Sequence, residues 1–283
     1  MGKRIRVLIR LAKDYLWSYL AIVFLRSYFR DIRCFILFVG YPRSGHSLIG
    51  SLLDAHPNVI IAQELNALQY FTKGFSKEQV FSLLIKNSKE VANKGRQSTG
   101  YSYVVQEQHQ GKFNKLSVIG DKKGWASSLL LQANSDLRFL LNTKIKIKIK
   151  YIHIYRNPFD NITTWARGGN RKKNVVDERN LLRVVDQYFE SADMVSILRD
   201  DPNVDLIDLK HEDFIKNPRL HLAQLCSFIG VEASSKYLNS CSRIVFTEPK
   251  ITRYSIFWPQ KIVEDVYERM SKHPLLRDYR YEI

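Results

Sequence analysis

Residues 35–48 have the sequence FILFVGYPRSGHSL, and this stretch decides the fold expected for the chain. A short apolar run leads into a loop bounded by Gly40 and Gly45, and an amphipathic stretch follows from Ser47 to Ala55. That order predicts a strand, a phosphate-binding loop and a helix. The two glycines allow a tight backbone whose N–H groups converge on one anion, and the helix adds the positive end of its dipole.

The loop departs from the nucleoside-triphosphate pattern at one position. Its spacing fits G-x-x-x-x-G-K-[ST], except that His46 takes the place of the lysine. The side chain that usually reaches the β- and γ-phosphates is therefore missing. A different cation, Arg43, lies inside the loop. We expect a loop that holds a phosphate without the lysine of a nucleotide-hydrolysing enzyme.

Length and composition limit the possible classes. At 283 residues the chain forms one domain with a sizeable core, or one domain with a small appendage. The net charge of +16 favours an anionic partner, such as a nucleotide, a nucleic acid, a membrane surface or an acidic substrate. Cys34, Cys226 and Cys241 are too few for a disulfide framework and indicate a reducing compartment.

Residues 1–33 form a segment that is both basic and apolar, ahead of a main domain at residues 34–283. Eight Lys/Arg against two Asp give this segment about +6 of the charge. Its longest charge-free apolar run, Tyr15–Leu25, has eleven residues, whereas a spanning helix needs about 20. We expect a helix that packs on the domain or lies on a membrane surface; a membrane anchor and disorder are the alternatives. The expected compartment is the cytoplasm, with or without membrane association through residues 1–33, and the alternative is an anchor in a Golgi or secretory membrane.

Strands and helices alternate through the rest of the chain. This order predicts an α/β fold of the P-loop nucleotide-binding type, with a central parallel sheet and helices on both faces. Further strands are expected at Val59–Ala62, Leu116–Ile119, Lys144–Tyr155 and Val204–Leu209. Helices are expected near 65–95, 125–141, 177–199, 218–229, 233–241 and 259–272, with a further helix starting at Pro158. Two loops, 96–117 and 167–173, are expected to line the substrate site.

Polar residues follow four of the predicted strands. The carboxyl ends of parallel strands share one edge of the sheet, so these segments should meet there. The four segments are Arg43–Ser47, Glu64, Asp121–Lys123 and Arg156–Thr164. One carboxylate is thus placed among several cations beside a phosphate loop. Two separated anion sites indicate a donor with a phosphate at each end.

These residues resemble a known family. Tyr41–Leu48 is similar to the 5′-phosphosulfate loop of sulfotransferases, which use 3′-phosphoadenosine 5′-phosphosulfate (PAPS). Tyr155–Thr164 is similar to their 3′-phosphate motif, an arginine followed eight residues later by a hydroxyl residue. Pro42–Glu64 is closest to the tyrosylprotein sulfotransferases, and Gly120–Lys122 resembles the catalytic-lysine segment of that group. The resemblance extends over about residues 35–275 and implies transfer of a sulfuryl group from PAPS to an acceptor hydroxyl or amine.

The resemblance also implies a role for each matching residue. Glu64 would be the general base, and Arg43 and Lys122 would neutralise charge on the leaving group, with Lys122 favoured over Lys123. The 5′-phosphate would be held by Arg43, Ser44, Gly45, His46, Ser47 and Leu48. The rest of the donor would be held by Arg156, Thr164, His211 and Arg253. His211 stands where the family has a Tyr that stacks near adenine, and Arg253 with Lys250 belongs to a segment, Thr247–Trp258, that replaces a Gly-rich phosphate segment. No metal is expected, because cations already surround the leaving phosphate.

Several alternatives stay open at this point. Glu64 could be a helix N-terminal acid, and Thr164 could bond its own helix backbone. We interpret His153 as a core residue and the sequon Asn161-Ile162-Thr163 as a chance match. The rival functions are a P-loop kinase or NTPase and a non-enzymatic basic module. The acceptor class is not identified by any residue, and we expect no nucleic-acid partner.

Overall fold

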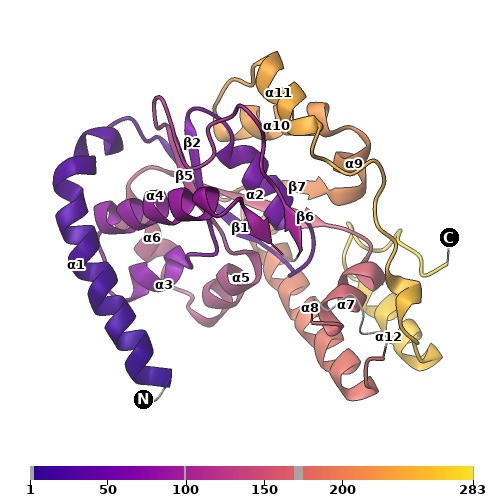
Figure 1. Cartoon of the computed structure of the whole chain (residues 1–283). Helices are drawn as coiled ribbons and strands as arrows, with labels where there is room; N and C mark the ends of the chain where they lie inside the picture. The colour runs from indigo at the N-terminus through magenta and orange to yellow at the C-terminus, as the bar shows by residue number, and fades with distance from the viewer. Residues whose placement is uncertain (1–2, 99, 169–174, 283) are drawn as a thin grey trace.

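The computed structural model describes residues 3–98, 100–168 and 175–282, and it contains a five-stranded parallel sheet in the order β2-β5-β1-β6-β7 (Figure 1). The strands are β1 (Cys34–Val39), β2 (Val59–Gln63), β5 (Val118–Lys122), β6 (Lys148–Tyr155) and β7 (Asp205–Lys210). The chain adds β2 and β5 on one side of β1 and then β6 and β7 on the other. The strand order therefore reverses at β1, and ligands bind beyond such a reversal in open α/β sheets.

Helices cover both faces of the sheet, which confirms the predicted α/β fold. Odd-numbered residues of β1 belong to one hydrophobic cluster and even-numbered residues to another. The first cluster includes side chains of α1 (Lys3–Phe29), α3 (Ala67–Thr72), α4 (Lys77–Asn93), α5 (Gly124–Ala133), α6 (Leu137–Ile145) and α8 (Glu178–Asp200). The second includes α2 (His46–Asp54), α9 (His211–Lys216), α10 (Pro218–Ile229) and α11 (Ser235–Ser242).

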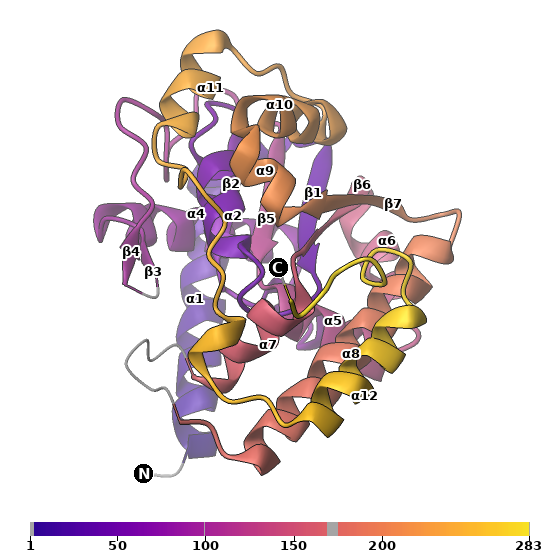
Figure 2. The same cartoon turned by 90° about the vertical axis from the view of Figure 1, so that its right-hand side faces the viewer.

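A third cluster lies beside the end of β6. It joins α8 to α7 (Pro158–Ala166) and α12 (Gln260–Ser271), which stand together in Figures 1 and 2. Tyr41, at the start of the predicted phosphate loop, stacks on Tyr188 of α8 with ring centroids 4.2 Å apart. The loop is thus anchored to this third cluster as well as to β1.

The basic N-terminal segment forms one long helix, α1, which crosses α4 and packs against it (Figure 1). Leu11, Leu25 and Phe29 join the first hydrophobic cluster, and the Tyr70 hydroxyl donates to Asp14 at 2.6 Å. Among the described residues, no helix combines the length and the apolar character needed to cross a membrane.

Three sequence-based boundaries need correction. The segment expected to be helical near 65–95 forms two helices, α3 and α4, separated at residues 73–76. The helix expected at 125–141 is two helices, α5 and α6, separated at residues 134–136. The strand expected from Lys144 starts at Lys148, because α6 continues to Ile145. Leu137, Leu141 and Ile145 recur every four residues and are all buried, so they place one face of α6 in the core. The Lys/Ile alternation in residues 144–150 fitted a strand equally well.

Only the first part of the segment expected as a loop at 96–117 lines the pocket. It begins with a small hairpin of β3 (Gln97–Ser98) and β4 (Tyr101–Ser102). Its later part packs on the scaffold: Gly111 N–H donates to Asp54 at 2.8 Å, and Asn114 N–H donates to the Pro57 carbonyl at 2.7 Å. Buried backbone groups need such partners, which explains why this part stays close to the core.

Candidate active site

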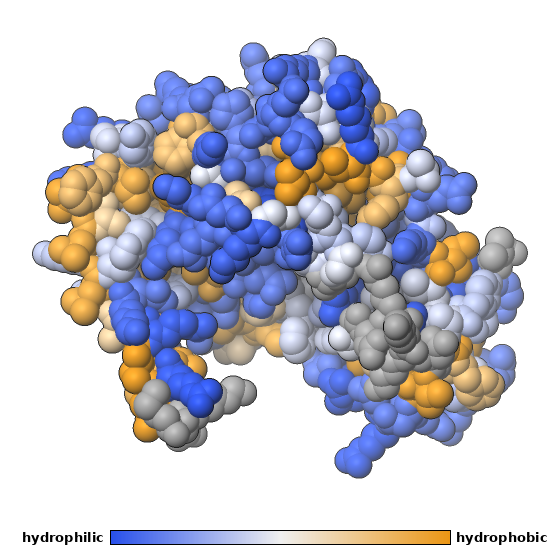
Figure 3. Space-filling model, in the orientation of Figure 1, coloured by the Kyte–Doolittle hydropathy of each residue, from blue (hydrophilic) through white to orange (hydrophobic). Residues whose placement is uncertain are grey.

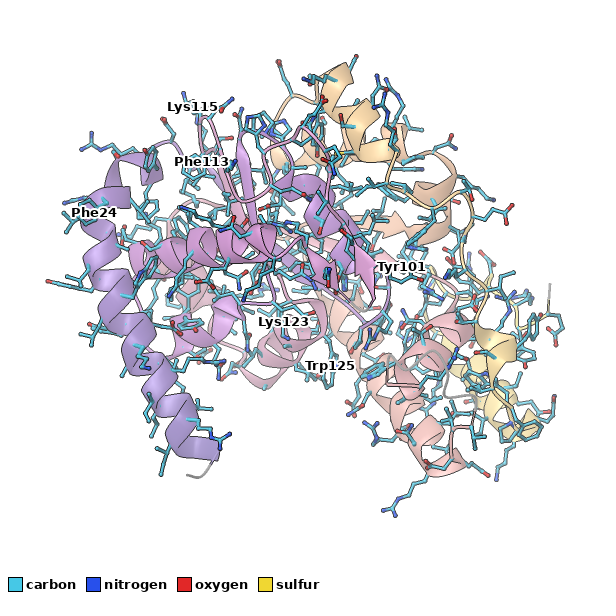
Figure 4. The ribbon with its side chains drawn as sticks, viewed as in Figure 1. Phe24, Tyr101, Phe113, Lys115, Lys123 and Trp125 are labelled. Carbon is cyan, nitrogen blue, oxygen red and sulfur yellow. The ribbon has the colours of Figure 1, made fainter. Side chains whose placement is uncertain are left out.

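A pocket of about 870 Å³ opens at the carboxyl ends of the strands, where the sequence predicted it. Most of the predicted residues line it, namely Arg43, Gly45, His46, Ser47, Leu48, Glu64, Lys122, Arg156, Thr164 and His211. Two predicted residues, Ser44 and Arg253, do not. Figure 4 shows three further lining residues, Tyr101, Lys123 and Trp125, on the same side of the molecule.

The phosphate loop has an unusual backbone. Gly40 and Gly45 have φ of 105° and 107°, and Arg43 is also left-handed at 67°. A side chain at Gly45 would be excluded in any case, because its Cβ would lie 2.5 Å from Cδ2 of His211. A left-handed arginine is costly, and such strain is concentrated at functional sites. The loop is therefore held in one shape by contacts from outside it.

His46 does not supply the positive charge that the loop lacks. Its Nε2 donates to the Val39 carbonyl at 3.2 Å, and its ring is buried. Burial, with the charge of Lys122, lowers the pKa of His46 to about 3. Ser44 also points inward, since its hydroxyl donates to the Tyr41 carbonyl at 3.1 Å. These two side chains shape the loop, and only the backbone of Ser44 remains to bind an anion.

The missing cation comes from the neighbouring strand. Lys122, at the end of β5, donates to Ser47 Oγ at 3.1 Å and to Glu64 Oε1 at 2.8 Å. Its stem crosses α2 at Gly50, where a Cβ would lie 2.9 Å from Cγ of Lys122. Burial lowers the pKa of Lys122, against the opposing effect of Glu64. Lys122 therefore links the phosphate loop to the carboxylate.

Glu64 stands next to Lys122 because β2 and β5 pair with Gln63 opposite Lys122. Its second oxygen accepts from Lys123 at 3.2 Å, and its side chain is 53% exposed. Partial burial disfavours ionisation, but Lys122 and then Lys123 outweigh that effect and lower the pKa of Glu64 to about 2. The carboxylate is thus charged, accessible and held by two cations.

Asp121 positions the turn that carries Glu64, a role that sequence reasoning missed. Its buried carboxylate accepts from the backbone N–H of Leu65 at 3.1 Å and of Ala67 at 2.8 Å. Burial raises the pKa of Asp121 to about 6 despite these bonds. Glu64 itself has φ of 58°, and Asn66 has φ of 68°. The signal for this role is a buried acid beside a turn with left-handed residues. Sequence reasoning missed it because burial is not visible in the sequence.

Arg156 lies next to the phosphate loop at the end of β6. Its guanidinium donates to the carbonyl of Arg43 at 3.3 Å, and to the Lys250 carbonyl and Thr252 Oγ1, both at 3.4 Å. All three acceptors are neutral. Burial lowers the pKa of Arg156, with Asp160 opposing that effect. Within the part of the chain that the structure describes, this buried guanidinium bonds neutral oxygens only, which suits it to receive an anion.

Thr164 and Arg253 differ from the sequence prediction in their contacts. Thr164 lines the pocket, but its hydroxyl lies 2.8 Å from the Asp160 carbonyl in its own helix. Arg253 forms a buried ion pair with Asp160 at 2.7 Å and also donates to the Tyr281 carbonyl at 2.6 Å. The prediction for Arg253 is therefore corrected: its charge is neutralised inside the protein, and Lys250 and Thr252 line the pocket in its place.

Aromatic side chains that sequence reasoning missed also line the pocket. Tyr101 contacts Phe246 with ring centroids 5.2 Å apart, and its hydroxyl accepts from Lys250 at 2.8 Å. Trp125 and Trp165 line the pocket as well, and their rings meet edge to face with centroids 5.2 Å apart. The hairpin of β3 and β4 closes over the phosphate loop, with Ser98 Oγ 3.2 Å from Ser47 Oγ. Most of the predicted loop 167–173 lies outside the described residues.

The pocket therefore presents two cationic regions separated by the phosphate loop. One contains Lys122, Lys123 and Glu64, and the other contains Arg156. Burial, with the charge of Arg156, lowers the pKa of His211 to about 3, so this ring adds no charge between them. In residues 3–98, 100–168 and 175–282, no three His, Cys, Asp or Glu side chains converge in a way that could hold a metal ion.

Comparison with known proteins identifies a family for most of the chain. A model of the family described as sulfotransferase domain matches residues 35–273. The sulfotransferase domain of the olefin synthase from Synechococcus PCC 7002 has a TM-score of 0.54 and 16% identity, covering 86% of this chain and 94% of that one. A sulfotransferase from Mycobacterium avium has a TM-score of 0.50 and 10% identity, covering 97% and 86%. At these identities both structures show the fold alone. The comparison with curated proteins found no match.

Proposed function

This chain belongs to the sulfotransferase domain family, and we propose that it transfers the sulfuryl group of PAPS to an acceptor hydroxyl or amine, with Glu64 as general base. One observation carries the proposal. Lys122 contacts both Ser47 of the phosphate loop and Glu64, in a pocket that also contains Arg156. The resemblance to tyrosylprotein sulfotransferases stays a prediction, and the acceptor class is open.

The two cationic regions account for the choice of donor. The backbone N–H groups of the loop and the N-terminus of α2 would hold the 5′-phosphate, as helix N-termini commonly do. Arg156 would hold the 3′-phosphate, because its guanidinium contacts only neutral oxygens in the described residues. Lys250 and Thr252 stand beside it and would add donors. A nucleotide without a 3′-phosphate would leave this buried charge unpaired.

Lys122 and Arg43 would act on the leaving group. Sulfuryl transfer is chemically analogous to phosphoryl transfer, in which positioning and charge neutralisation dominate. As the bond between sulfur and the bridging oxygen breaks, negative charge builds on that oxygen. Lys122 is aimed at Ser47 of the loop that would hold the 5′-phosphate, and Arg43 makes no ion pair with any described residue. Both cations are therefore available to the leaving nucleotide.

Glu64 would take the proton of the acceptor as the new bond to sulfur forms. In the structure both its oxygens bond lysines, which makes it a weak base. An anionic donor beside Ser47 would draw Lys122 toward itself and free Glu64 Oε1. The base would then become effective only with the donor in place, and general-base catalysis of this kind contributes about 10²–10⁴ in rate.

The proposal is tested by ligand binding, which needs no knowledge of the acceptor. Calorimetric titration should show 3′,5′-adenosine bisphosphate binding at least about tenfold more tightly than 5′-AMP, because hydrogen bonds to charged groups contribute roughly 1.5–3 kcal/mol. Arg156→Ala should abolish that difference while leaving the affinity for 5′-AMP unchanged. Arg183→Ala, which removes an exposed arginine of α8, is the matched control.

Two results would contradict the proposal. One is tight binding of ATP·Mg²⁺ with no binding of the bisphosphate, which would favour a P-loop kinase or NTPase. The other is an unchanged preference for the bisphosphate in Arg156→Ala. If the preference is present, a screen of hydroxyl and amine acceptors with radiolabelled PAPS then identifies the acceptor class.

A further inference from the structure

The helix α1 has two apolar faces, and only one of them is covered. Leu11, Ser18, Leu25 and Phe29 face the domain. On the opposite side, apolar residues also recur at steps of three or four, at positions 5, 9, 12, 16, 20 and 23. The outer series advances about one turn of helix per step, and the residues facing the domain repeat after two turns or one, so the two series form two stripes along the same helix. A surface helix of a globular protein normally has a polar outer face.

We call this outer stripe, with Phe24 beside it, the α1 outer face. Leu16 and Leu20 are each 65% exposed, Val23 is 77% exposed and Phe24 is 80% exposed. Phe24 projects from α1 away from α4 (Figure 4), and the space-filling view shows hydrophobic residues along this helix (Figure 3). Single exposed apolar residues are ordinary, but a continuous stripe of them marks an interaction surface.

Charged residues on α1 indicate the chemistry of the partner. Arg6 and Lys13 lie beside the stripe on one side, Arg26 lies on the other, and Arg30 directly follows the end of the helix; all four are exposed. The two acidic residues of residues 1–33 are both engaged, Asp14 with Tyr70 and Asp31 with Lys115 at 3.9 Å. Tyr19 and Trp17 are also exposed on this helix, and such rings favour the boundary between water and lipid.

We propose that the α1 outer face binds an anionic membrane surface, with the helix lying in the plane of the lipid headgroups. The apolar stripe would enter the boundary of the acyl chains while the flanking arginines and lysine contact lipid phosphates. A second copy of the chain would suit this face less well, because it would bring the same four cations against themselves. This inference does not depend on the proposed catalytic function.

The test is flotation of the full chain with vesicles made of equal amounts of phosphatidylcholine and phosphatidylserine. The variant Leu16→Glu/Leu20→Glu should float at least about tenfold less than the unmodified protein, because two leucines that would enter the lipid are replaced by charges. The control Leu220→Glu/Phe257→Glu changes two other exposed apolar residues by the same charge and should float normally. Binding to vesicles of phosphatidylcholine alone should be weaker than to the mixture.

Three outcomes would overturn the proposal: no flotation of the unmodified protein, equal flotation of both double variants, or a dimer in sedimentation that only the α1 variant dissociates. The last would show that a second copy covers the face. If the α1 variant fails to fold, brominated lipid gives an independent test. It should quench tryptophan fluorescence in the unmodified chain and much less in Trp17→Phe, and equal quenching in both would contradict the proposal.

Discussion

Two carboxylate–cation clusters lie next to β2, one beside Ile61 in the middle of the strand and the other just beyond its carboxyl end, and they have opposite characters. Asp54 and Arg96 form an ion pair whose side chains are almost completely buried. Glu64 and Lys122 form another, but the Glu64 side chain is half exposed to the pocket. The first cluster also receives donors from Ile61 N–H and Ser88 Oγ, both at 2.6 Å from Asp54 Oδ1. In the second cluster, the described residues that bond Glu64 are Lys122 and Lys123, and Lys122 also bonds Ser47.

The first cluster holds structural elements together, whereas the second faces the pocket and can take part in a reaction. Asp54 is bonded from α4, β2 and the segment 96–117, so it fixes these elements around α2 and has no contact left to exchange. Burial raises its pKa, and the charge of Arg96 opposes that change. Glu64 is held by flexible side chains that a ligand can draw away. A buried pair with saturated partners stabilises, whereas an open pair can change partners during a reaction.

The largest effect is expected for Glu64→Gln. Turnover should fall about 10²–10⁴-fold, because the amide cannot accept the acceptor's proton. Binding of 3′,5′-adenosine bisphosphate should be nearly unchanged, since Glu64 does not bind the donor. Single-turnover assays with radiolabelled PAPS and calorimetry measure the two quantities. Glu107→Gln, an exposed glutamate paired with Lys236, is the control; equal turnover in both variants would remove Glu64 from the mechanism.

Asp54→Ala should show the reverse pattern, with a large loss of stability. It leaves the charge of Arg96 buried without its partner, which typically costs about 3–5 kcal/mol. Urea denaturation measures this change in the free energy of unfolding. Asp31→Ala removes an exposed acid with a long contact to Lys115 and should cost less than about 1 kcal/mol. If Asp54→Ala were as stable as Asp31→Ala, the distinction between the two clusters would fail.

Asp121→Asn should give a smaller loss, confined to turnover. The amide can accept from only one of the two backbone N–H groups of the turn, so Glu64 is held less firmly. We expect turnover to fall about tenfold, with the affinity for the donor unchanged. A fall in donor affinity with normal turnover would contradict a positioning role. The exposed Asp136→Asn serves as the control.

The smallest effect is a shift in the pH dependence. Partial burial opposes ionisation of Glu64, but Lys122 and Lys123 together lower the pKa of this carboxyl to about 2. Removing one of these charges in Lys123→Met destabilises the carboxylate, so the pKa of Glu64 should rise. The acidic limb of kcat/KM, which reports the free enzyme, should then move to higher pH. The exposed Lys236→Met should leave the limb unchanged, and a shift toward lower pH in Lys123→Met would contradict the interpretation.

Much of the site was predictable because its residues follow strands directly. Glu64, Lys122 and Arg156 could be placed together from the expectation of a parallel sheet alone, since its strand ends share one edge. Residues 1–33 were expected to form a helix that packs on the domain or lies on a membrane surface, and residues 3–29 form the helix α1, which packs on the domain. The split of the helix at residues 134–136 could not be foreseen, because the same pattern of apolar residues fits one helix or two.

The sequence by itself determined the α/β fold, the phosphate loop without its lysine, and the set of cations that follow the strands. These features depend on local spacing, which the chain carries in its own order. Only the tertiary structure decided which charges are already neutralised. Asp160 pairs with Arg253, 93 residues away, whereas the hydrogen-bond partners of Arg156 among the described residues are neutral. Long-range pairing of this kind depends on how the segment after β6 packs against the C-terminal segment. No short stretch of sequence determines that packing.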